Sequence, residues 1–406
     1  MSLFGLREAE VAQLIRGVSD DDPDRDAVAD RFARVAWSCL TEPGDRVAGE
    51  LVQTVGVTSA LEGMIQRWDA QRFAAAARGM EVDELAAGIA RWTPRFKAAD
   101  VLLALRQAAR FGARLRTAAD DGWPAGLSDL GEHAPFVLWT RGTDAALAAL
   151  DRSIALVGAR AATGYGEHVT MEASAGLVDR GFAIVSGGAY GIDGMAHRAA
   201  LASGGHTIAV LAGGIDRFYP SGHEALLNRI VDAGCVATEV PPGTPPTRWR
   251  FLARNRLIAA LGQATVVMEA GWRSGALNTA NHANDLARPL GAVPGPVTSS
   301  ASAGCHRIIR EGARLVTTPD EMAALVTSDE PGGPAGFDDP DVIRVVDALS
   351  ARSGRAADDI AARAGMSVAD VQAVLGRLEL DGVVREASRG WVRDASVRRS
   401  QAGAPV

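Results

Sequence analysis

Residues 154–158 read Ile-Ala-Leu-Val-Gly, and residues 183–194 read Ala-Ile-Val-Ser-Gly-Gly-Ala-Tyr-Gly-Ile-Asp-Gly. Each short apolar run ends in a turn of small residues, and each turn leads into a segment of helical character. This alternation predicts parallel strands of a βαβ unit, with both turns at the carboxyl edge of one sheet. Small residues there let backbone N–H groups approach an anion, and a helix N-terminus adds partial positive charge. The stretch therefore predicts a phosphate-binding edge with Arg160 beside it.

The same alternation continues along the chain around this stretch. Strands are expected at 154–158, 182–186, 207–212, 236–240, 264–269, 290–293 and 314–317. Helices are expected between nearly all of them, at 164–180, 191–203, 222–233, 251–262, 275–287 and 305–312. Regular alternation of this kind is typical of an α/β fold with a doubly wound, mainly parallel, Rossmann-like sheet.

The flanking segments differ from this central block in pattern. The expected organisation is a helical sterile-alpha-motif-like or helix-hairpin-helix domain at 1–115, a connecting segment at 116–150, the Rossmann-like domain at 151–326, a Gly/Pro/acidic linker at 327–340, a winged-helix domain at 341–394 and a disordered tail at 395–406. A helix-turn-helix layout around Gly365 predicts the winged helix. The helical half is acidic and its glycine pattern is loose, which favours packing over DNA binding there.

Composition narrows the class of protein. The net charge of −7 argues against a protein that simply coats nucleic acid, but residues 151–325 hold 15 basic against 14 acidic side chains. All the basic side chains are arginine except Lys97, and arginine offers phosphates a planar fork. No apolar run is long enough for a membrane helix, and the N-terminus lacks a signal-peptide layout. Three scattered cysteines form no framework, so we expect a cytoplasmic protein without a membrane partner.

Five loops at strand ends supply the candidate anion site. Its residues are Gly158, Arg160, Ser186, Gly187, Gly188, Tyr190, Gly191, Gly213, Gly214, Tyr219, Arg254, Asn255, Arg256, Ser274 and Gly275. The G-x-G-x-x-G pattern is absent after the first strand and no P-loop motif occurs, which disfavours a nicotinamide cofactor and a P-loop nucleotide. No cluster with metal-ligand spacing and no nucleophile–His–Asp motif is found. We therefore expect no metal, no cofactor and no catalytic residue.

Several of these side chains have a structural reading beside the functional one. Arg160 could form a salt bridge at the sheet edge instead of binding an anion, and Tyr219 could be a core aromatic instead of a stacking surface for bases. Arg254 and Arg256 open an expected helix, where the helix dipole disfavours cations unless an anion is bound. Glu269 could pair with one of them.

Two further side chains near the expected glycine turn have mainly structural readings. Asp193 could cap the helix that carries His197. His197 could act as a base, but capping, packing or a structural hydrogen bond is favoured.

Taken in order, the motifs of the central block resemble the DNA-processing protein A family, also called Smf or DprA. The resemblance rests on Ala155-Leu-Val-Gly-Ala-Arg160, Tyr165-Gly166, Ile184–Asp193, Ala196-His197, Ala200-Leu201, Gly205–Leu211, Tyr219-Pro220, Glu239-Val-Pro241, Phe251, Arg254–Ile258, Val267–Ala270, Ser274–Leu277, Thr279-Ala280, Val293-Pro-Gly295 and Gly312-Ala313. Ser221 and His223 depart from the family pattern, which often has Lys and Asn there, and so do Leu252 and His306.

The resemblance implies a function as well as a fold. Such a protein binds single-stranded DNA, loads the recombinase RecA onto it, protects incoming DNA in natural transformation, and forms a homodimer through its central domain. Arg160 would be the principal phosphate contact, and the candidate residues above would line the same pocket. The family is not known for a chemical reaction.

Two other classes stay open from the residues alone. One is a nucleotide phosphoribohydrolase-like enzyme on a related fold, although the glutamate of that signature is missing after Gly275. The other is a regulator or scaffold that acts through the winged helix, whose expected second helix offers few basic side chains, chiefly Arg377.

Overall fold

Five runs of small and β-branched residues form the centre of a nine-stranded sheet. The computed structural model describes residues 6–327, 340–350, 353–380 and 383–393. The strands of this sheet are β1 (Arg114–Arg116), β2 (Leu138–Gly142), β3 (Ser153–Gly158), β4 (Ala183–Gly187), β5 (Thr207–Val210), β6 (Cys235–Thr238), β7 (Ala264–Glu269), β8 (Leu290–Ala292) and β9 (Arg314–Leu315). Side chains of β4 to β7 are buried on both faces, as parallel sheets require.

The strand order places a switch point at the middle of the sheet. The order is β1-β2-β6-β5-β4-β3-β7-β8-β9, and β3 to β9 pair in parallel. The chain first runs outward from β3 to β6 and then returns to place β7 on the other side of β3. Ligands bind outside the carboxyl ends of the strands at such a reversal. The expected doubly wound, mainly parallel sheet is confirmed.

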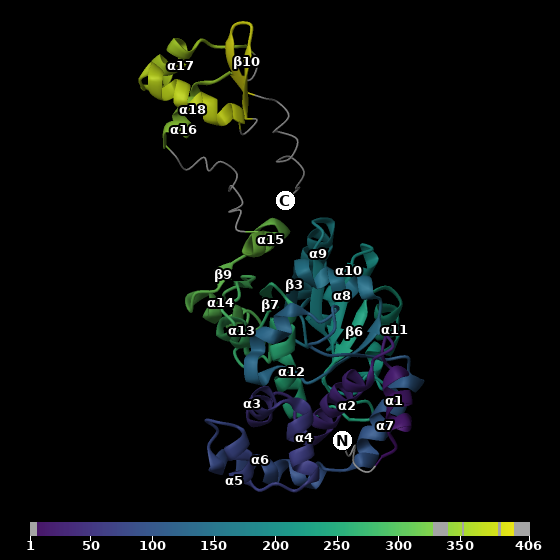
Figure 1. The fold of residues 1–406 in the computed structure, drawn as a ribbon. Helices are drawn as coiled ribbons and strands as arrows, with labels where there is room; N and C mark the ends of the chain where they lie inside the picture. The colour runs from purple at the N-terminus through teal and green to yellow at the C-terminus, as the bar shows by residue number, and fades with distance from the viewer. Residues whose placement is uncertain (1–5, 328–339, 351–352, 381–382, 394–406) are drawn as a thin grey trace. The chain divides into compact units, whose positions relative to one another are not determined.

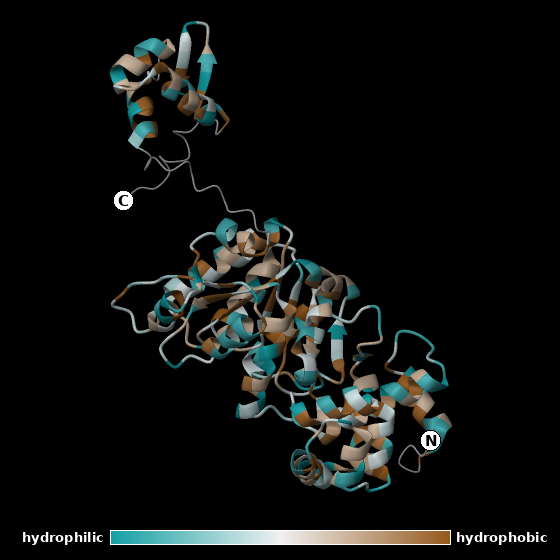
Figure 2. Ribbon diagram, turned by 60° about the vertical axis from the view of Figure 1, so that its left-hand side comes forward, coloured by the Kyte–Doolittle hydropathy of each residue, from teal (hydrophilic) through white to brown (hydrophobic). Residues whose placement is uncertain are grey.

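Helices cover both faces of the sheet (Figure 1). The helices of this central part are α8 (Asp144–Ala148), α9 (Gly164–Asp179), α10 (Ile192–Ala202), α11 (Glu224–Ala233), α12 (Arg248–Leu261), α13 (Ala276–Asp285), α14 (Ala303–Arg310) and α15 (Pro319–Thr327). One face of the central strands packs on α9 and α10, through Ile154, Leu156 and Ile184. The other face packs on α12 and α13, through Ala155, Val157 and Val185. Figure 2 shows hydrophobic residues concentrated along the sheet and on the helix faces toward it.

The sheet extends beyond the block in which alternation is visible. Strand β1 pairs antiparallel with β2, and β2 pairs antiparallel with β6. The expected boundary at 115 therefore falls within β1, and the expected connecting segment 116–150 supplies β2. Strand β1 is an antiparallel strand at the edge of the sheet and lies outside the alternation of strands and helices, so that pattern does not reveal it. The short helix α15 (Pro319–Thr327) was also not expected from the sequence.

The α-helices described before the sheet are α1 (Glu8–Arg16), α2 (Arg25–Leu40), α3 (Arg46–Val55), α4 (Val57–Ile65), α5 (Ala70–Ala76), α6 (Val82–Trp92) and α7 (Ala98–Arg110). Gly56, at φ 91°, separates α3 from α4. The core of these helices is continuous with apolar side chains of β2, β5, β6 and α11. Residues 1–328 accordingly form one compact unit.

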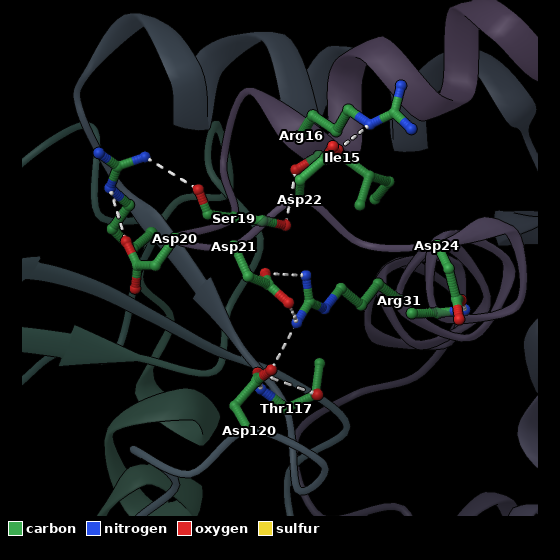
Figure 3. A network of polar contacts seen from close by, with 12 residues as sticks. Ile15, Arg16, Ser19, Asp20, Asp21, Asp22, Asp24, Arg31, Thr117 and Asp120 are labelled. Carbon is green, nitrogen blue, oxygen red and sulfur yellow. Dashed lines mark hydrogen bonds and ion pairs between the residues drawn. The ribbon is translucent and has the colours of Figure 1, made fainter.

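A polar network also joins these helices to the sheet (Figure 3). Arg31, on α2, is 8% exposed and donates to Asp21 and Asp120, both at 2.6 Å. Asp120 in turn accepts from the backbone N of Thr117 at 2.6 Å, just after β1. The two carboxylates offset the charge of the buried Arg31 guanidinium. The network therefore holds α2 against the segment that follows β1.

The second compact unit, 329–406, has its own core. Its described elements are α16 (Pro340–Ala348), α17 (Ala357–Ala364), α18 (Val368–Leu380), β10 (Val384–Ala387) and β11 (Gly390–Arg393). Gly365 ends α17 in the left-handed conformation (φ 65°), and β10 and β11 pair antiparallel. This is a winged helix. The tail expected at 395–406, and the linker apart from residues 327 and 340, lie outside the described residues.

Candidate functional site

A groove of about 830 Å³ lies at the switch point of the sheet. It is bounded by the loop after β3, the loop after β7 and the first three turns of α12. Seven of the candidate residues line it: Gly158, Arg160, Tyr219, Arg254, Asn255, Ser274 and Gly275. Because parallel strands end at one edge, residues far apart in the sequence meet here.

Arg160 is one of three exposed arginines that line this groove, with Arg248 and Arg273. It follows β3 directly, and its guanidinium lies 4.7 Å from the ring centroid of Phe251. Among the described residues, it forms no ion pair. The aromatic ring holds the guanidinium in place without neutralising its charge, so the charge is available to an anion.

Arg254 has a different environment, because α12 begins earlier than expected. The helix starts at Arg248, and the Thr247 side chain caps it by accepting from the Arg250 backbone N at 3.3 Å. Arg254 therefore lies in the second turn, and the argument from the helix dipole was wrong. Its guanidinium donates to the Val210 carbonyl, and Nε donates to Asn255 at 3.3 Å. It is 5% exposed, and burial lowers its pKa to about 10.

Arg256 points away from the groove. Its two terminal nitrogens donate to the Glu239 carboxylate at 2.7 and 2.6 Å, and both side chains are buried. Glu269, the partner that the sequence suggested, instead accepts from the Thr163 backbone N at 2.8 Å and from its hydroxyl at 2.6 Å. Arg256 is thus held by a buried pair and does not line the groove.

The Ser186–Gly191 turn lies beneath the groove. A Cβ on Gly187 would lie about 2.5 Å from both the Asp193 carboxylate and the Arg254 guanidinium, so only glycine fits between them. The Ser186 hydroxyl donates to the Leu156 carbonyl at 2.6 Å. Gly191, at φ 75°, is the N-cap of α10, and Asp193 therefore lies in the first turn of that helix and is not its cap.

The other candidate residues support the rim. Gly188 accepts a 3.1 Å hydrogen bond from His223, whose ring also contacts Tyr190 edge-on. Gly213 packs against Pro246, and Gly214 packs against Asp216 and the backbone of Gly243. The candidates Gly188, Tyr190, Gly213 and Gly214 do not line the groove. Tyr219 does line it, and it is 53% exposed.

His197 has a structural environment. It is fully buried, with Nε2 2.9 Å from the Gly187 carbonyl and Nδ1 2.7 Å from the Thr207 hydroxyl. A carbonyl can only accept, so Nε2 carries the proton that is donated to Gly187. The Thr207 hydroxyl beside Nδ1 also donates to the Ile184 carbonyl at 2.9 Å. Burial lowers the pKa of His197 to about 4. It therefore supports the turn as a neutral imidazole.

Four basic or aromatic residues line the groove but are not among the candidate site residues: Arg248, Phe251, Trp272 and Arg273. Phe251 was noted only as part of the resemblance, and Arg248 fell outside α12 because the helix start was placed three residues late. Trp272 and Arg273 lie in the loop after β7, which is one of the five candidate loops, but only Ser274 and Gly275 of that loop were expected in the site. An earlier capping signal at Thr247 could have identified Arg248.

The groove is suited to an anion. Among the described residues that line it, Arg160, Arg248, Arg254 and Arg273 carry positive charge, and Asp193 carries the carboxylate. Burial raises the pKa of Asp193 to about 6, although Arg254 and Arg160 act to lower it. The described residues contain no group of three His, Cys, Asp or Glu that could hold a metal ion. Nor does any described helix have the length and apolar character needed to span a bilayer.

Two family models match the chain. Residues 114–327 match the model of DNA recombination-mediator protein A, and residues 329–388 match the DprA winged helix domain. The first match begins at β1, in agreement with the extended sheet. The groove lies entirely within it.

Relatives and a solved structure agree with these matches. A DNA processing protein DprA of Mycobacterium tuberculosis (strain H37Rv) is 44% identical over 377 residues, which cover 88% of this chain and 93% of the relative. The DNA processing protein DprA of Streptococcus pneumoniae is 40% identical over 209 residues, covering 50% of this chain and 71% of the relative. An X-ray structure of the Streptococcus pneumoniae protein has a TM-score of 0.57 and 31% identity, covering 74% of this chain and 97% of that one.

The buried carboxyl of Asp193 should make stability depend on pH. Its folded pKa, about 6, lies above the ordinary value of 3.8, so the folded state binds the proton more tightly. Its stabilising contribution is complete below about pH 4 and is lost as pH rises through 6. Relative to Asp193→Asn, the wild-type free energy of unfolding should therefore fall by roughly 1–3 kcal/mol between pH 4 and 7.

Denaturant unfolding of both proteins at several pH values measures this difference. His197, whose pKa is depressed, acts in the opposite direction but is present in both proteins and cancels. A difference that stays constant between pH 4 and 7 would show that Asp193 does not titrate in this range.

Proposed function

The chain belongs to the DNA recombination-mediator protein A family, and on that premise we propose that its groove binds single-stranded DNA and that the bound protein loads the recombinase RecA onto the strand. The observation that carries the proposal is the pairing of exposed arginine with aromatic side chains in one groove. Of the site residues that the sequence suggested, we propose that the seven that line the groove bind the strand, whereas the others hold the surrounding loops and helices in place.

The charges support binding of the DNA backbone. Arg160, Arg248 and Arg273 are exposed, line the groove and form no ion pair with described residues. Each can therefore meet a phosphate without first breaking a salt bridge. Arg254 is buried beside them, where its charge adds to the field and two of its five N–H groups donate within the protein.

The aromatic side chains support an unpaired strand over a duplex. The rings of Tyr219 and Phe251 lie 5.7 Å apart at 57° to each other, on one side of the groove. An unpaired base presents a flat face that stacks on such a ring, whereas the faces of paired bases are covered by their neighbours. Stacking is tolerant of sequence, so the groove would accept strands of varied sequence.

Removal of the Arg160 charge should weaken binding of single-stranded DNA. Because Arg160 would neutralise one phosphate, Arg160→Ala should also reduce the slope of log K against log salt by about 0.7. Fluorescence anisotropy with a labelled oligothymidylate at several salt concentrations measures both quantities. Arg152→Ala is the matched control. Arg152 is also exposed, but it precedes the first residue of β3, whereas Arg160 follows the last.

The two variants together decide whether the groove is the site. We expect Arg152→Ala to retain wild-type affinity and slope. Equal affinity and slope in Arg160→Ala and wild type would exclude Arg160 as a phosphate contact. Loss of affinity without a change of slope would give Arg160 a role other than phosphate binding.

RecA loading and self-association are the finer parts of the proposal. The matching family is that of a recombination mediator, and such a mediator has to hold the unpaired strand while a recombinase assembles on it. The resemblance noted above supports RecA as that recombinase and a homodimer through the central sheet.

RecA assembly gives a second measurement of function. On single-stranded DNA covered by single-strand-binding protein, the wild type should accelerate the onset of RecA ATP hydrolysis. Arg160→Ala should lose this acceleration in proportion to its loss of DNA affinity, because loading would require the strand in the groove. Full acceleration by a variant that no longer binds DNA would separate loading from the groove.

A further inference from the structure

Two tryptophans near the groove are exposed, but only one of them lines it. Trp272, between β7 and α13, is 58% exposed and lines the groove, whereas Trp249, on α12, is 60% exposed and does not. We propose that Trp272, with Arg307 behind it and Arg273 beside it, forms a second subsite that binds an unpaired base. This inference rests on the proposed function and adds a stacking position separate from Phe251 and Tyr219.

The loop that carries Trp272 is held in place by its backbone. The Ser274 backbone N donates to the Gly271 carbonyl at 3.0 Å and closes the turn around the tryptophan. The Gly304 backbone N donates to the Ala270 carbonyl at 2.7 Å. A Cβ on Gly304 would lie 2.6–2.7 Å from the carbonyl oxygens of Gly271 and Ala270, so the start of α14 packs directly on this loop. The indole is thus presented on a fixed turn.

Arg307 orients the indole from one side. Its guanidinium carbon lies 5.6 Å from the centroid of the Trp272 ring, within the range of a cation–π contact. Glu311 holds Arg307 from the next turn of chain, with Nε 3.5 Å from the carboxylate. A cation can occupy only one face of the ring, which leaves the opposite face for a flat partner.

The adjacent charge indicates what that partner is. Arg273 follows Trp272 directly, is exposed, lines the same groove and has no ion-pair partner among the described residues. A ring for stacking beside a cation matches one nucleotide, whose base and phosphate are neighbours in the strand. The phosphates of a duplex could bind Arg273, but its paired bases could not stack on Trp272, so the subsite would favour single strands.

Replacement of the indole should weaken binding in a way that depends on bases. Stacking on an aromatic side chain contributes enough that Trp272→Ala should reduce affinity for oligothymidylate roughly fivefold to a hundredfold. Trp272→Phe should retain most of the affinity. Trp249→Ala, which removes an equally exposed tryptophan outside the groove, should bind like wild type. An oligonucleotide of the same length with abasic sites should bind wild type and Trp272→Ala equally.

The outcomes separate this inference from the proposed function. If wild type binds no single-stranded DNA, the proposed function fails. If wild type binds but Trp272→Ala binds equally well, or loses the same factor on abasic DNA, the base subsite is overturned. Sedimentation of each variant identifies the remaining alternative: if Trp272→Ala weakens binding only because it dissociates an oligomer, Trp272 is a contact between copies and the subsite is also overturned.

Discussion

Helix α12 buries three arginines, Arg250, Arg254 and Arg256, and the site depends on the hydrogen-bond partners of each guanidinium. Arg250 donates to the Glu42 carboxylate at 3.0 and 2.8 Å, and Arg256 donates to Glu239. Arg254 donates to the carbonyl that ends β5. A buried guanidinium without such partners would cost several kcal/mol, about 3–5 when a pair is broken. These contacts therefore fix α12 across the carboxyl ends of the strands.

The same contacts connect the N-terminal helices to the groove. Glu42 lies in the loop after α2, where Arg95 also binds it at 2.7 Å. Burial acts to raise the pKa of Glu42, but Arg250 and Arg95 hold it below its ordinary value. Gly44, at φ 76°, follows in the same loop, and a Cβ there would lie 2.9 Å from Arg256. The helical part thus packs on the outward side of α12 while Arg254 and Asn255 face the groove.

Much of the fold could be predicted from the sequence, but less of the site. Strands β3 to β9 were all expected near their observed positions, because buried parallel strands read as short apolar runs between turns. The sequence also suggests a strand at Pro135–Trp139, which overlaps the start of β2 (Leu138–Gly142), but it gives no signal for β1, whose pairing depends on long-range contacts. Arg254 and Arg256 looked alike in the sequence, since spacing along a helix does not show which carboxylate or carbonyl each side chain meets. Arg254 and Arg256 are buried whereas Arg160 is exposed, and solvent exposure depends on tertiary contacts that the sequence does not show.

A photocrosslinking measurement tests the central claim, that the groove at the switch point holds a single strand of DNA. An oligonucleotide with photoreactive bromouracil bases would be irradiated with the protein, and the modified peptides identified by mass spectrometry. The account predicts adducts on the peptides that contain Tyr219, Phe251 or Trp272, all of which line the groove. Adducts confined to the winged helix or to helices α1 to α7 would contradict it.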